Sequence, residues 1–88
     1  MDSHSLLNAL IDLAETLGIA TRRVSRAGEG PGGALVRLKG RELLMLDPAS
    51  PLADQIAVVA AALKGRPSLD DRFLPPEVRQ VIETAGAE

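Results

Sequence analysis

The chain has 88 residues and a net charge of −2, with no cysteine, one histidine and one aromatic residue, Phe73. Disulfide bridges and thiolate metal sites are therefore excluded, as is stacking of single-stranded bases on a row of aromatic side chains. A chain this short supports one hydrophobic core with a thin margin of stability, so we predict a single domain over residues 1–88 that forms a homodimer. No apolar run approaches the roughly 18 residues of a membrane span. The first twenty residues contain Asp2, Asp12 and Glu15, whereas a secretory signal would be basic and then apolar. We expect a cytoplasmic protein without a membrane partner.

Leucines at helical spacing predict a first helix over residues 5–17. Gly18 follows the last periodic residue and can adopt the left-handed conformation that ends a helix, with Ile19 folding back onto the last turn. Asp2 and Ser3 are both suitable N-caps, and the choice stays open. The apolar stripe consists of Leu6, Leu10, Leu13 and Leu17.

Residues 19–26, IATRRVSR, mix β-branched residues with arginines and predict an edge strand. The run GEGPGG follows, and Gly28, Gly30 and Gly33 match the pattern G-x-G-x-x-G. A dinucleotide site needs these glycines to open a helix, whose N-terminal N–H groups hold the pyrophosphate. Here they lie between two predicted strands, so we interpret them as a connector and predict no cofactor.

Residues 34–47, ALVRLKGRELLMLD, predict a β-hairpin with a two-residue turn at Lys39 and Gly40. The resulting register pairs Leu38 with Arg41, Arg37 with Glu42, Val36 with Leu43, Leu35 with Leu44, and Ala34 with Met45. The second strand is apolar on both faces, which is typical of a strand that is covered on both. We expect helices on one face and suggest another subunit on the other.

Residues 50–64, SPLADQIAVVAAALK, predict a second helix. Ser50 can cap its N-terminus, Pro51 suits the first helical position, and Gly65 ends it. An apolar strip on this helix consists of Val58, Ala61 and Ala62. This strip either receives a helix of another subunit or is buried inside the monomer, and both interpretations stay open.

The C-terminal segment predicts an apolar anchor at Phe73 and Leu74 and a short helix from Pro76 to about Thr84. The order of elements is then helix, strand, hairpin, helix, helix. We predict a small α+β fold, α-β-β-β-α-α, in which helices pack mainly on one face of an antiparallel sheet of about three strands.

The residues for catalysis or metal binding are scarce. His4 lies in the first turn of the first predicted helix, there is no cysteine, and each serine has a capping or surface explanation. We predict that the protein is not an enzyme and has no catalytic, cofactor-binding or metal site.

The middle of the chain is basic, with a net charge of +5 over residues 22–41 and −7 over the rest. Its cations are Arg22, Arg23, Arg26, Arg37, Lys39 and Arg41. A continuous patch of this kind would bind nucleic acid or an acidic protein partner. Cations on exposed strands also prevent edge-to-edge association, which is the structural alternative.

The chain contains the segments LAETLGIATRRV and GALVRLKGRELLMLDPASPLADQIAVVAAAL. Through them, about residues 10–64 resemble the N-terminal half of ImmA/IrrE-type zinc metallopeptidases. That family places H-E-x-x-H where this chain has AAALK, Ala60 to Lys64, so the resemblance implies a shell without a catalytic centre. The sequence Leu74 to Arg79, LPP-x-VR, also resembles short uncharacterised bacterial proteins.

These observations favour a non-catalytic interaction or assembly module that self-associates. The predicted interface residues are Leu44, Leu46, Val58, Ala61 and Ala62. The alternatives are nucleic-acid binding through the basic strand and hairpin, and a degenerate metallopeptidase-like shell.

Overall fold

The computed structural model describes residues 2–24, 32–69 and 72–85. In chain order the elements are α1 (Ser3–Thr16), β1 (Ala20–Arg23), β2 (Gly33–Leu38), β3 (Arg41–Leu46), α2 (Leu52–Leu63), the 3-10 turn η1 (Pro67–Leu69) and α3 (Pro76–Thr84). The predicted α+β class and the order α-β-β-β-α-α are confirmed.

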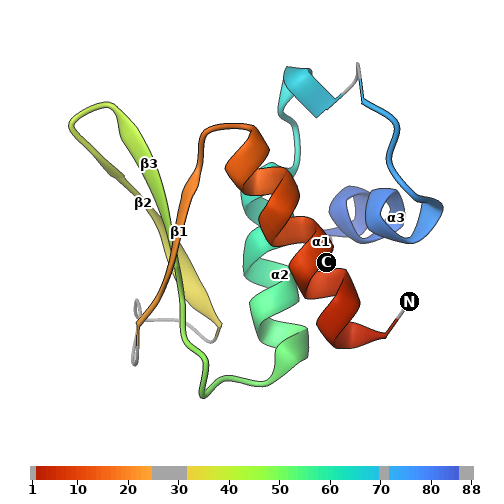
Figure 1. The fold of residues 1–88 in the computed structure, drawn as a ribbon, viewed down its shortest axis with the longest axis horizontal. Coiled ribbons are helices and arrows are strands. Elements are labelled where there is room, and N and C mark those ends of the chain that lie inside the picture. The colour runs from red at the N-terminus through yellow and green to blue at the C-terminus, as the bar shows by residue number, and fades with distance from the viewer. Residues whose placement is uncertain (1, 25–31, 70–71, 86–88) are drawn as a thin grey trace.

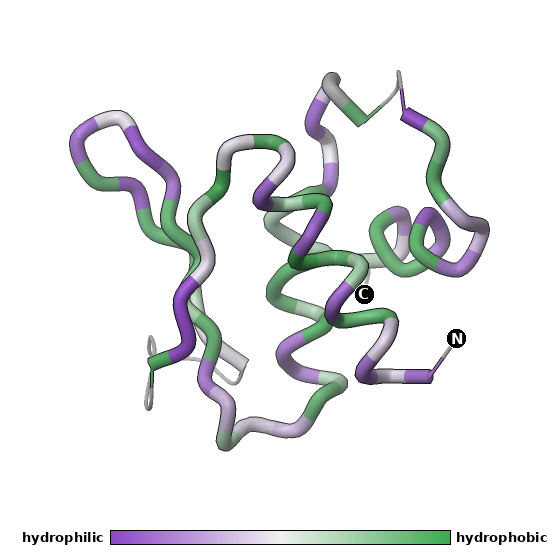
Figure 2. Tube along the Cα trace, in the orientation of Figure 1, coloured by the Kyte–Doolittle hydropathy of each residue, from purple (hydrophilic) through white to green (hydrophobic). Residues whose placement is uncertain are grey.

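The elements form three layers (Figure 1). The sheet is one layer, α1 and α2 lie side by side on one of its faces, and α3 packs on these two helices from the other side. The β2–β3 hairpin extends past the helix layer, and hydrophilic residues gather at its tip (Figure 2). The helices therefore occupy only one side of the sheet, as predicted.

Local hydrogen bonds fix both ends of α1. Asp2 is the N-cap, and its carboxylate accepts a hydrogen bond from the backbone N–H of Ser5 at 2.7 Å. Gly18 has φ +90°, and the N–H of Ile19 donates to the carbonyl of Ala14 at 3.0 Å. This closure turns the side chain of Ile19 into the core, where it is 1% exposed.

The hairpin has the predicted register, from Leu38 opposite Arg41 to Ala34 opposite Met45. Lys39 and Gly40 both have positive φ, 51° and 78°, as a two-residue turn of this type requires.

The sheet is mixed, so the prediction of an antiparallel sheet was wrong for one of its two ladders. The strand order is β1-β3-β2, and β1 pairs with β3 in parallel. The tight turn forces β3 to run antiparallel beside β2, and β1 then pairs with the free edge of β3. The apolar strand thereby becomes the central one, with ladders on both edges, and β1 is an edge strand as predicted.

The start of α2 differs from the prediction. Pro51 is the N-cap and no side chain caps the helix, so Ser50 lies one residue before the cap position. The hydroxyl of Ser50 instead accepts a hydrogen bond from the N–H of Gly32 at 3.1 Å. A Cβ at Gly32 would overlap the backbone carbonyl of Asp54, so the chain entering β2 passes directly against the first turn of α2. Gln55 is 4% exposed and donates to the carbonyl of Ser50 at 2.8 Å.

The core lies between the sheet and the helices and extends to α3. Leu74 is buried as predicted, whereas Phe73 is 88% exposed and is not an anchor. The larger fully buried side chains are Leu10, Ile19, Leu44, Leu46, Val59 and Leu63.

Candidate interaction surface

One face of the sheet is covered by none of the described elements. Successive residues of a strand point to opposite faces, and Leu44 and Leu46 point to the helices. Leu43 and Met45 therefore point to the other side, where both remain partly exposed. We call this surface the open face. Its residues are Ala20, Arg22, Val24, Ala34, Val36, Leu38, Arg41, Leu43 and Met45.

The open face is mostly apolar although it is accessible to solvent. Val24 and Leu38 are 42% and 62% exposed. Soluble monomers seldom leave a contiguous apolar patch without a partner.

The predicted interface residues Leu44 and Leu46 are not available for contact. Both are 0% exposed beneath α1 and α2, so they belong to the core of the monomer and the prediction was wrong for them.

Two of the three residues in the apolar strip of α2 pack within the monomer. α2 is packed between the sheet, α1 and α3, so Ala62 is buried and Val58 packs partly buried against the core. Of the three strip residues only Ala61 is exposed. Small side chains here allow the close approach of neighbouring elements of the same chain.

A hollow of about 520 Å³ lies at the hairpin end of the open face. Its floor is apolar, and the charged residues of its lining are Arg22, Lys39, Arg41 and the acid Glu42. Three of the six predicted cations are thus brought together. Arg23 lies on the opposite face of the sheet, and Arg26 lies outside the described residues.

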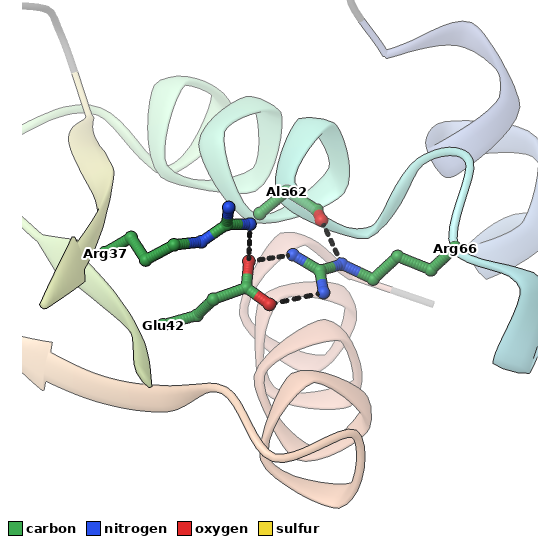
Figure 3. Close-up of polar contacts among 4 residues, drawn as sticks. All are labelled: Arg37, Glu42, Ala62 and Arg66. Carbon is green, nitrogen blue, oxygen red and sulfur yellow. Dashed lines mark hydrogen bonds and ion pairs between the residues drawn. The ribbon is translucent and has the colours of Figure 1, made fainter. Parts of the chain in front are cut away.

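Arg37 points away from this hollow, toward a cluster that joins the hairpin to the end of α2 (Figure 3). The guanidinium of Arg66 donates both Nη groups to the Glu42 carboxylate, with Nη1 at 2.8 Å from Oε1. Its Nε donates to the carbonyl of Ala62 at 2.6 Å. Arg37 adds a weaker ion pair to Glu42 at 3.8 Å.

Hydrogen bonds from Arg66 are the main cause of a lowered pKa at Glu42, and the charges of Arg66 and Arg37 lower it further. The same hydrogen bonds raise the pKa of Arg66. Both groups are therefore charged at neutral pH, and they fasten the hairpin to the helix layer.

A second hollow, of about 380 Å³, lies between the C-terminal end of α2 and α3. Two of its cations already have partners, because Arg66 binds Glu42 and the Nζ of Lys64 donates to the carbonyl of Ala85 at 2.8 Å. The hollow on the open face is the stronger candidate, since its cations have no ion-pair partner in the described part of the chain.

Gly33 begins β2, so the described end of the glycine run enters a strand and not a helix, whereas Gly28 and Gly30 lie outside the described residues. Ala60 to Lys64 lie at the end of α2, and no three His, Asp or Glu side chains of the described residues are grouped to hold a metal. None of the described helices is long and apolar enough to span a bilayer.

Comparisons with protein-family models, curated proteins and solved structures give no significant match. Function is therefore inferred from the residues and geometry of this chain.

Proposed function

We propose that the protein is a non-catalytic assembly module of the cytoplasm that self-associates through its open face. The observation that carries this proposal is the central strand, which has Leu44 and Leu46 in the core while Leu43 and Met45 remain on the solvent side. Burial of that second apolar face by another copy gains free energy in proportion to the apolar area removed from water.

The size of the chain is consistent with a partner. A domain of 88 residues has a small core and gains stability from association.

Replacement of Met45 by lysine tests the proposal, because it places a charge in the middle of the open face. Met45→Lys should remain folded and lose self-association. Ala57→Lys is the matched control, since Ala57 is exposed on α2 and away from the sheet. Size-exclusion chromatography with light scattering gives the mass, and Met45→Lys associating as tightly as wild type would refute the role of this face.

Nucleic-acid binding is the second candidate, and the gathering of Arg22, Lys39 and Arg41 around one hollow favours it. Phosphate contacts release counterions, so binding of this kind weakens steeply as salt rises. Titration of labelled duplex DNA and RNA at low and at physiological salt tests this. No binding at low salt would eliminate the candidate.

A further inference from the structure

The open face has opposite charges at its two ends. Arg41 lies beside the hairpin turn. At the other end, the N–H of Asp47 donates to the carbonyl of Gly32 at 3.0 Å, so the strand alternation continues to Asp47 and places it on the open face. One carboxylate oxygen of Asp47 accepts from the N–H of Ala49 at 2.9 Å, and the second has no partner within the described residues.

Side-chain size is also complementary on this face. Large and small residues alternate along the edge strands, with Val36 two residues from Ala34 on β2 and Arg22 two residues from Ala20 on β1. Consider a two-fold axis that lies between two stacked copies of the sheet and crosses the strands at right angles at the level of Leu44. This axis places Val36 of one copy over Ala34 of the other, and Arg22 over Ala20. Each large side chain then faces a small one of the second copy.

We propose that a second copy stacks on the open face with its strands antiparallel to those of the first, so that Arg41 of each copy pairs with Asp47 of the other. This arrangement rests on the proposed function and specifies its partner and register. Leu43 then lies against Met45 of the second copy at the centre, in two sheets about 10 Å apart. A two-fold axis parallel to the strands would instead bring the two Arg41 side chains together.

The hollow of the open face has an occupant in this arrangement. Val24 and Met45 of the second copy lie over its apolar floor, which includes Leu38 and Leu43. The remaining cations are at the edge and the tip of the sheet, where long side chains reach solvent.

The size of the face sets the expected strength. Two strands of six residues and one of four form a footprint of at most about 14 by 20 Å. Such an area is below that of a standard interface, so we expect a dissociation constant of about 1 to 100 μM.

Charge reversal tests the register, with the dissociation constant measured by sedimentation equilibrium. Arg41→Asp and Asp47→Arg should each weaken the dimer by about tenfold or more, because each creates two like-charge contacts. The double variant should recover wild-type affinity, and an equal mixture of the two single variants should form heterodimers. Arg23→Asp, the same charge change on the opposite face, should have little effect, and circular dichroism checks that each variant is folded.

Each outcome separates the register from the proposed function. A wild-type dimer that is unaffected by Arg41→Asp, or a double variant that stays weak, refutes the antiparallel register alone. Wild type that is monomeric up to millimolar concentration refutes both. If Asp47→Arg fails to fold, Asp47→Asn keeps the acceptor for Ala49 and should still weaken the dimer several-fold at low salt; unchanged affinity would refute the pairing.

Discussion

Replacement of Leu44 and Leu43 by alanine, one at a time, measures which face of the central strand is in the core. Leu44 is 0% exposed, and deletion of such a side chain costs about 3 kcal/mol through lost burial and the cavity left behind. Leu43 is partly exposed on the open face, so its truncation should cost about 1 kcal/mol in the monomer. A domain of 88 residues has about 4 to 13 kcal/mol of stability in total, so the Leu44 change is a large fraction of it.

Thermal unfolding followed by far-ultraviolet circular dichroism makes the comparison, because the chain has no Trp or Tyr. Leu44→Ala should lower Tm by about 12 to 24 °C and Leu43→Ala by about 4 to 8 °C. The melts belong at low micromolar protein or below, where association contributes least. Equal losses for the two variants would refute the assignment of faces.

Three further results are expected. Hydrogen bonds from Arg66 lower the pKa of Glu42 below its ordinary value of 4.5, so the contribution of the Glu42 carboxylate to stability is complete above pH 4.5 and is lost as the pH falls through the lowered pKa. The difference in Tm between wild type and Glu42→Gln should therefore shrink over that acidic range, and a difference that stays constant would contradict this. Gly32→Ala should destabilise by about 1 to 3 kcal/mol in urea unfolding, because φ is +88° and the new Cβ overlaps the carbonyl of Asp54; unchanged stability would show that α2 can move away. Phe73→Ser should change stability by less than about 0.5 kcal/mol, since the ring is 88% exposed, and a large loss in the same assay would place the ring in the core.

Local chemistry was enough to predict most of the fold. The end of α1 follows from Gly18 and the fold-back of Ile19, and the hairpin register follows from the two-residue turn at Lys39 and Gly40. These features depend on neighbours in the sequence, so spacing and residue type determine them. The pairing of β1 depends on a distant strand, and no turn chemistry specifies it.

The choice of the exposed face could not be made from the sequence, because both faces of β3 are apolar. The charged pair of Arg37 and Glu42 lies on the same side of the hairpin as the buried Leu44, although a charged pair usually faces solvent. That pair is accommodated beside the helices by Arg66, which is 24 residues from Glu42 in the chain. Sequence spacing gives no sign of such a contact.

The alanines of α2 were ambiguous for a similar reason. Small residues permit close packing, but they do not reveal whether the neighbour belongs to the same chain. In the structure the neighbours are the sheet, α1 and α3, so the candidate interface moves from α2 to the open face.

The most direct test of self-association is the solution mass of the wild-type chain over a concentration series, by light scattering with refractive-index detection. The proposal predicts a mass that rises from 9.2 kDa toward twice that value across the micromolar range. A mass that stays at 9.2 kDa up to millimolar concentration would contradict it.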